Sequence, residues 1–129
     1  MSARKQLVHR SSGTTEPVQQ LGPYQIEPLL TEDQEAAATA YRVRVEPHQQ
    51  TTPSYHRVAE EFYFILAGTG TAVLDGAPQA LKPGDFLRLP PGTQHAFITD
   101  NEPLEMLDIH VPGCRPERDT YFVDNPKGK

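Results

Sequence analysis

A histidine and a glutamate lie five residues apart at the start of an apolar stretch, "PSYHRVAEEFYFILAG" (residues 53–68). These are His56 and Glu61, and a second histidine, His95, lies in the later stretch "GDFLRLPPGTQHAFIT" (residues 84–99). Two neutral imidazoles and one carboxylate that converge form a facial triad, which leaves open coordination positions on iron, manganese, nickel or zinc. The alternative is that each is only a solvated polar side chain at the end of a strand.

Convergence of these side chains requires a particular course of the backbone. In one regular strand, residues five apart point to opposite faces, so His56 and Glu61 converge only if a bend or bulge lies between them, at residues 57–59. His95 must then arrive from another strand. A small barrel has room for one small ligand in its mouth, where a metal would polarise a carbonyl or bind dioxygen beside a chelating substrate.

The surrounding sequence has the pattern of short strands separated by turns. Tyr41, Val43 and Val45 alternate with charged residues, as in a strand with one buried face. Asp75 and Gly76 both tolerate positive φ and predict a hairpin turn. The run at 61–68 is almost continuously apolar, which is typical of a strand covered on both faces. Many short strands at close spacing predict a sandwich or a barrel, with strand-like runs at residues 40–47, 61–68, 71–92, 94–99 and 104–111.

Both histidine-bearing stretches resemble the signature motifs of the cupin superfamily. The first motif is a glycine, five residues, His-x-His, three or four intervening residues, a glutamate, six residues and a glycine. The second is a glycine, five residues, Pro-x-Gly, two residues, a histidine, three residues and an asparagine. The resemblance covers roughly residues 40 to 112, and the matching positions are His56, Glu61, Gly68, Gly84, Pro90, Gly92 and His95.

The resemblance implies an all-β fold, a double-stranded β-helix (jelly-roll) cupin barrel of two antiparallel sheets. It also implies a divalent metal ion (iron, manganese, nickel or zinc), since cupins usually hold one with two histidines of the first motif, its glutamate and the histidine of the second. This chain keeps three of those four ligands, which are His56, Glu61 and His95.

Three positions depart from the cupin pattern. Ser54 stands at the position of the usual fourth ligand, where it either weakens the metal site or leaves an extra open coordination position and hydrogen-bonds a metal-bound water. His48 stands at the opening glycine and either replaces the missing ligand or is solvated. Thr99 stands at the closing asparagine.

Tyr63 and His110 are the candidate catalytic residues. Tyr63 alternates with Glu61, so it either points inward near the metal or is a core aromatic residue. Asp108 and His110 share one strand face, and they form an acid/base pair if that face lines the pocket. If it faces solvent, the core is filled by the other face, and the alternation favours this second arrangement, with Leu107, Ile109 and Val111 inside.

Other residues are expected to have structural roles. Phe86 and Phe97 are expected to line the pocket or the core, and Gly68, Gly84 and Gly92 to supply turns that other residues would strain. Cys114 has no general base placed beside it by the sequence and is interpreted as an incidental small residue.

Length and composition narrow the class of protein. The 129 residues suit one domain, and the net charge of −5 argues against a nucleic-acid partner. A single cysteine excludes an internal disulfide, no apolar run approaches the roughly 18 residues of a membrane span, and no signal peptide is recognisable, so a cytoplasmic protein is expected. The predicted organisation is a polar N-terminal arm (1–20), mobile or swapped onto a partner, a cupin barrel (21–123) and a C-terminal tail (124–129).

The expected function is that of a metal-binding single-domain cupin with a small-molecule ligand in its barrel. The resemblance favours an enzyme that acts on a small polar or enolisable molecule, dioxygenase-like or isomerase-like, although the sequence leaves open whether the protein is an enzyme. The alternative is a non-catalytic module that binds a small ligand or a sugar. Small cupins usually pair, so a homodimer is also expected.

Overall fold

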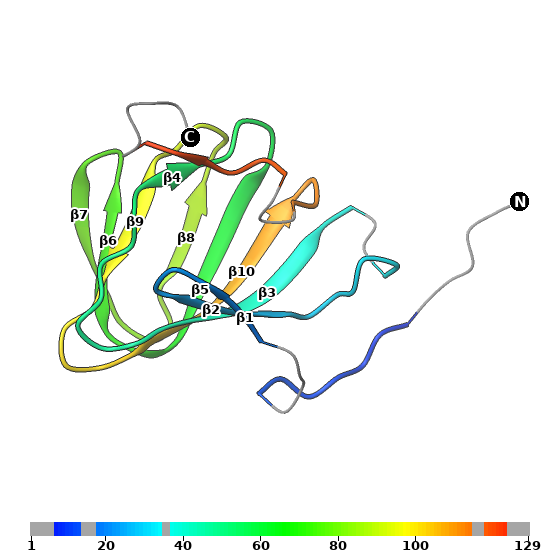
Figure 1. Ribbon diagram of the computed structural model, residues 1–129, viewed down its shortest axis with the longest axis horizontal. Coiled ribbons are helices and arrows are strands. Elements are labelled where there is room, and N and C mark those ends of the chain that lie inside the picture. The colour runs from blue at the N-terminus through cyan, green and yellow to red at the C-terminus, as the bar shows by residue number, and fades with distance from the viewer. Residues whose placement is uncertain (1–6, 14–17, 35–36, 115–117, 124–129) are drawn as a thin grey trace, which may run out of the picture.

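Two antiparallel sheets face each other across a common interior in the computed structural model of the protein (Figure 1). The structure describes residues 7–13, 18–34, 37–114 and 118–123. One sheet contains, in spatial order, β1 (Gln19–Leu21), β2 (Tyr24–Pro28), β3 (Thr39–Val45), β10 (Leu104–Val111), β5 (Glu60–Gly68) and β8 (Phe86–Leu89). The other contains β11 (Tyr121–Phe122), β4 (Ser54–Tyr55), β9 (His95–Ile98), β6 (Gly70–Leu74) and β7 (Ala77–Leu81).

This architecture confirms the predicted all-β jelly-roll barrel. The chain repeatedly crosses between the sheets, so strands adjacent in sequence are seldom neighbours, and β10 lies between β3 and β5. Over its described residues the chain contains no α-helix, and hence no helix that is long and apolar enough to span a membrane. The predicted hairpin is present between β6 and β7, with φ of 48° at Asp75 and 84° at Gly76.

Side chains of alternating strand residues fill the interior. Tyr41, Val43 and Val45 on β3 are buried as predicted, while Arg42 and Arg44 point outward and both pair with Glu105 of β10. The most deeply buried large side chains, which form the centre of the apolar core, are Val45, Ile65, Phe97, Leu104 and Met106.

The favoured orientation of β10 was wrong. The strand's buried positions are Leu104, Met106, Asp108 and His110. Leu107, Ile109 and Val111 lie instead on the half-covered outer face. β10 is a central strand with partners on both sides, and part of the interior is a cavity with polar side chains at its floor. An apolar face therefore does not identify the inner side of this strand.

The outer face of β5 is less covered than its composition indicates. Phe64 and Leu66 are about 40% exposed, at 42% and 38%, so this face is not covered within the described chain. Phe86 of β8 stacks on Phe62 on this outer face and is mostly exposed, so its predicted place in the pocket or core was wrong, whereas Phe97 is in the core as expected. Whether a second copy covers this face, as the expected homodimer requires, stays a prediction.

The predicted domain boundaries also stay a prediction. Gln19 and Gln20, assigned to the N-terminal arm, form β1 and pair with β2. Residues 1–6 and 14–17 of the arm and the whole predicted tail, 124–129, lie outside the described residues.

Candidate metal centre

The connection between β4 and β5 brings His56 close to Glu61. β4 belongs to one sheet and β5 to the other, so residues 56–59 form the predicted bend where the chain crosses between them. The Asp119 carboxylate holds this bend by accepting hydrogen bonds from the backbone N–H groups of residues 57, 58 and 59 at 2.9–3.0 Å. The Nδ1 of His56 lies 2.7 Å from the Asp119 carbonyl oxygen, which directs Nε2 toward Glu61.

Glu61 lies at the meeting point of the three residues predicted from the sequence. Its Oε1 is 3.3 Å from the Nε2 of His56 and 3.3 Å from the Nε2 of His95, which comes from β9 in the opposite sheet. All three side chains are buried, and their ligand atoms lie within 4.8 Å of one another. Ligands bound tetrahedrally at about 2.0–2.1 Å are about 3.3–3.4 Å apart, so this spacing suits a shared divalent ion.

The second oxygen of Glu61 is held by two residues from the same sheet. Tyr63 donates its hydroxyl hydrogen to Oε2 at 2.7 Å, and the Nε2 of His110 lies 2.9 Å from the same oxygen. His110 is also 3.3 Å from His56, Nε2 to Nε2. Both candidate catalytic residues therefore contact Glu61, and Tyr63 is at the same time part of the core cluster.

Several buried polar atoms of this centre lack a hydrogen-bond partner among the described residues. They are Oε1 of Glu61, Oδ1 of Asp108 and Nδ1 of His110. Buried polar atoms are normally paired, so such a cluster indicates a missing ligand, ion or water. Glu61 Oε1 is the most informative of them, because two imidazole nitrogens face it.

Burial and charge act in opposite directions on Glu61. Burial raises the pKa of its carboxyl group, but the charge of His95 and the contacts with the His110 and His56 rings outweigh burial and hold that pKa well below its usual range. Burial lowers the pKa of His95, so its ring is neutral near pH 7. An ionised carboxylate beside a neutral imidazole is the protonation state that metal ligands need.

The pKa values of two further groups at this centre, His56 and Asp108, are raised. Burial alone would lower the pKa of His56, but a hydrogen bond with Cys114 and the adjacent charged carboxylate of Glu61 raise it to about 10. Burial and the neighbouring charge of Glu61 raise the pKa of Asp108 well above its usual range, which favours its protonated form. A metal bound at this centre must therefore displace a proton from His56.

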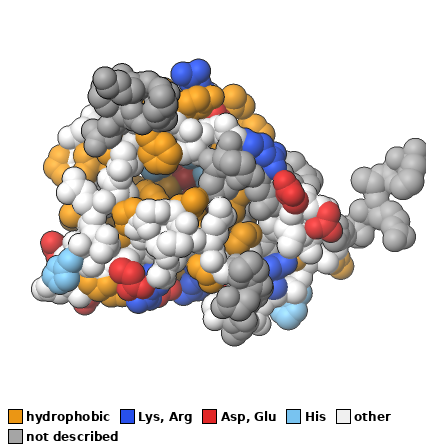
Figure 2. Space-filling view, in the orientation of Figure 1, with side chains coloured by type: hydrophobic (Ala, Val, Ile, Leu, Met, Phe, Trp, Pro, Cys, Tyr) orange, Lys and Arg blue, Asp and Glu red, His pale blue; other side chains and the backbone are white. Residues whose placement is uncertain are grey.

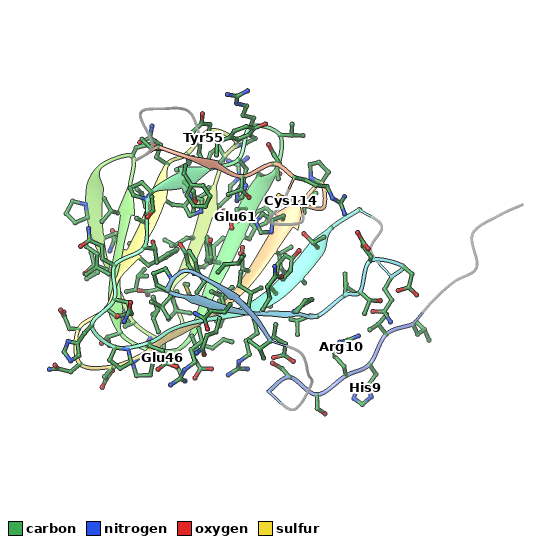
Figure 3. The ribbon with its side chains drawn as sticks, viewed as in Figure 1. His9, Arg10, Glu46, Tyr55, Glu61 and Cys114 are labelled. Carbon is green, nitrogen blue, oxygen red and sulfur yellow. The ribbon has the colours of Figure 1, made fainter. Side chains whose placement is uncertain are left out.

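The three departures from the cupin pattern lie in different places. Ser54 is buried, pairs with His95 across β4 and β9 and lines the cavity. His48 is exposed in the turn after β3, its N–H donating to the Asp100 carbonyl oxygen at 2.8 Å, so it does not replace the missing ligand. Thr99 donates to the Glu46 carbonyl oxygen at 2.6 Å. Figure 3 shows Glu46 toward the opposite end of the barrel from Glu61 and Cys114.

A cavity of about 370 Å³ opens above this centre. Most of its walls are apolar or aromatic, and none of its described lining residues is a lysine or an arginine. Figure 2 shows a recess framed by hydrophobic side chains, with acidic and histidine side chains visible at its floor. The apolar and aromatic residues of these walls include Leu21, Tyr24, Ile26, Tyr41, Val43 and Phe122.

Two residues at this centre were missed or undervalued by sequence reasoning. Asp119 lies far from the motifs in sequence, and its only local signal is an acidic residue in a turn. Cys114, predicted to be incidental, is buried with its Sγ 3.8 Å from Nδ1 of His56. The backbone N–H of Cys114 donates to Thr39 Oγ1 at 2.9 Å, which fixes the chain beside the centre.

Comparison with protein families now identifies the fold family. The model of the cupin domain family matches residues 41–110, which is more than half of the chain. The chain belongs to the cupin family. The match includes His56, Glu61, His95 and His110 but neither Cys114 nor Asp119, so the carboxylate that holds the bend lies outside the matched region.

Three curated relatives match parts of this cupin chain. Quercetin 2,3-dioxygenase of Bacillus subtilis is 37% identical over 59 residues, covering 46% of this chain and 18% of the relative. Dimethylsulfoniopropionate lyase DddQ of Ruegeria pomeroyi is 41% identical over 56 residues, covering 43% and 28%. An uncharacterised protein of Methanocaldococcus jannaschii is 38% identical over 70 residues, covering 54% and 55%. The chain thus spans about half or less of these relatives.

Solved structures support the same fold. The DddQ structure from Ruegeria pomeroyi superposes with a TM-score of 0.70 at 28% identity, covering 83% of this chain and 54% of that one. A Streptomyces PAC13 variant with uridine gives a TM-score of 0.75 at 17% identity, covering 92% of both chains. The second likeness shows the jelly-roll barrel alone, because its identity is low.

Proposed function

We propose that this cupin is a metal-dependent enzyme that acts on a small, uncharged, enolisable molecule. His56, Glu61 and His95 would hold a divalent iron, manganese, nickel or zinc ion. The observation that carries the proposal is the buried Oε1 of Glu61, which has no hydrogen-bond partner in the described chain and lies 3.3 Å from two imidazole nitrogens. A bound ion would act as a Lewis acid on a substrate oxygen.

The chain's own residues prepare the carboxylate and imidazoles for this role. Tyr63 donates to one oxygen of Glu61 and leaves the other directed at His56 and His95. The Asp119 carbonyl accepts from Nδ1 of His56, which fixes the ring and leaves Nε2 as the donor atom. Such outer partners orient metal ligands and are worth 10–100-fold in affinity, roughly.

The cavity supports a restriction on the substrate. Phosphate and carboxylate groups are usually bound by arginine or lysine, and no such side chain is among the described lining residues. The walls are mostly apolar and the polar groups gather at the floor, so the fitting ligand has an apolar body and an oxygen-bearing end. At about 370 Å³, the cavity accepts a small molecule.

Asp108 offers a proton donor for the same reaction class. Its carboxyl group is buried and lines the cavity, and burial beside Glu61 raises its pKa well above the usual range. A neutral carboxylic acid at the floor can give a proton to an oxygen or carbon of an enolisable substrate. Of the two reaction classes expected, the dioxygenase-like one is supported by the name of the Bacillus subtilis relative, and the isomerase-like one by this acid.

The test is turnover by the full chain loaded separately with iron, manganese, nickel and zinc. The substrates are small uncharged molecules with adjacent carbonyl and hydroxyl oxygens, beside their phosphorylated counterparts. Dioxygen uptake reports the dioxygenase-like reaction, and exchange of a substrate hydrogen with deuterated water reports the isomerase-like one. We expect turnover of uncharged substrates with one of the metals, and none in His95→Ala.

Two results would contradict this proposal. Binding of these molecules without turnover for any metal would favour the non-catalytic binding module instead. Equal turnover by the metal-free protein and by His95→Ala would show that the protein is an enzyme whose reaction does not depend on the metal.

A further inference from the structure

We propose that His110 is a fourth ligand of the metal, supplying the imidazole that Ser54 cannot supply. This inference rests on the proposed function, since it concerns the same centre. It goes beyond the motif residues, because His110 comes from β10, after both motifs have ended.

The distances around His110 are those of a ligand. Its Nε2 lies 3.3 Å from Nε2 of His56. That separation exceeds the usual length of a hydrogen bond from nitrogen, about 2.7–3.2 Å, so the two rings are poorly placed to bond each other directly. It equals the His56–Glu61 and His95–Glu61 separations, both 3.3 Å, and suits two nitrogens on one ion.

The sheet itself holds His110 at this place. His110 and Glu61 are direct partners in the pairing of β10 with β5, so their side chains project side by side into the interior. On the other side of β10, the ring of Tyr41 contacts the His110 ring edge-on, with centroids 5.8 Å apart. A donor fixed by central strands loses little conformational freedom when a metal binds.

The polar contacts of His110 all point toward the centre. Within the described chain, Nδ1 has no hydrogen-bond partner, whereas Nε2 faces Glu61 at 2.9 Å and His56 at 3.3 Å. His110 is also buried, although it lines the cavity, so its side chain has little contact with solvent. Its Nε2 therefore faces two of the proposed metal-binding residues, Glu61 and His56.

Ser54 is the reason why this chain would need an imidazole ligand from another strand. With His110 included, the donor set contains three imidazoles and one carboxylate, although residue 54 has only a short hydroxyl side chain. Ser54 lines the cavity on the sheet opposite to β10. Moving one imidazole from β4 to β10 therefore leaves the β4 side of the cavity to the substrate.

The experiment counts imidazole ligands and measures affinity in the same proteins. Wild type, His110→Gln and the control His48→Gln, an exposed histidine outside the centre, are loaded with cobalt(II). X-ray absorption at the cobalt edge gives the number of imidazoles, and competition with a chromophoric chelator gives the affinity. Thermal unfolding of the metal-free proteins checks that each variant is folded.

We expect three imidazoles in wild type and in His48→Gln, and two in His110→Gln. The affinity of His110→Gln should fall more than about 100-fold, beyond the loss typical of a residue that only orients a ligand. The wild-type count is decisive even if the variant fails to fold.

Two imidazoles in wild type, with the same number in His110→Gln, would overturn the role of His110 and leave the three-residue centre of the proposed function standing. No cobalt in wild type would overturn both proposals. The two failures are therefore distinguishable.

Discussion

The inward faces of β5 and β10 change character halfway along the barrel. At one end they are apolar and fully buried, and at the other they carry ionisable groups that are also buried. The apolar half consists of Ile65, Leu104 and Met106. The polar half consists of Glu61, Tyr63, Asp108 and His110.

The two halves lie on the same pair of strands, whose pairing register shifts between Glu105 and Met106 in the apolar half, and they differ in the side chains directed inward. The apolar half stabilises the fold by removing hydrocarbon surface from water. The polar half places a carboxylate and several imidazoles in an interior where unpaired charge is costly, which is expected only where function requires it. We call the apolar half the frame, and it positions the centre, which is the polar half.

The largest effect on stability should come from the frame. Ile65→Ala removes a fully buried side chain and should lower the free energy of unfolding by about 2–5 kcal/mol, because transfer and cavity terms add. The matched control is Leu66→Ala, the next residue, whose side chain is 38% exposed on the outer face. Denaturant unfolding measures both. Equal losses would show that the inward face of β5 is not the frame.

The centre should respond in metal affinity instead. Glu61→Gln keeps the shape of the side chain but removes the buried charge, and it should weaken metal binding more than about 100-fold, beyond the effect of an outer partner. The control is Glu60→Gln, whose carboxylate points outward and pairs with Arg88 at 2.8 Å. Chelator competition measures both variants, and an unchanged affinity in Glu61→Gln would remove Glu61 from the ligand set.

A smaller effect is expected where the bend is held. Asp119→Ala removes the acceptor of three backbone hydrogen bonds and should reduce metal affinity about 10–100-fold by loosening His56. Asp85→Ala is a suitable control, because Asp85 accepts from the backbone N–H of Lys82 in a turn away from the centre. If both variants bind metal as tightly as wild type, the bend does not position His56.

The smallest expected effect is a dependence of metal affinity on pH. The pKa of His56 is raised to about 10, so below that pH an incoming metal must displace a proton. Affinity should therefore rise with pH, about tenfold per unit between pH 7 and 9 for one proton, and level off above pH 10. Calorimetric titration in buffers of different ionisation enthalpy counts the released proton. A flat profile would mean that His56 is already neutral.

Much of the division between the apolar frame and the polar centre was predictable from the sequence. The alternation of β3 predicted its inward side chains. The resemblance to cupins implied that His56, Glu61 and His95 converge, and the five-residue separation of His56 and Glu61 required a bend between them for this to happen, because no regular strand brings both to one face.

The remainder depends on contacts that sequence spacing does not encode. The inward face of β10 was predicted wrongly because its outer residues are apolar and its inner ones include Asp108 and His110. The bonds from Asp119 to the bend join segments about 60 residues apart, as the separations of 60 to 62 positions show. Neither feature has a local pattern, because each arises only when the sheets come together.

The measurement that tests the account most directly is the metal content of the protein purified without chelator or a nickel column, by plasma mass spectrometry, for wild type and His56→Ala. The account predicts near-stoichiometric iron, manganese, nickel or zinc in wild type and a large fall in the variant. An absence of metal from both, persisting after reloading with each ion, would contradict the metal centre.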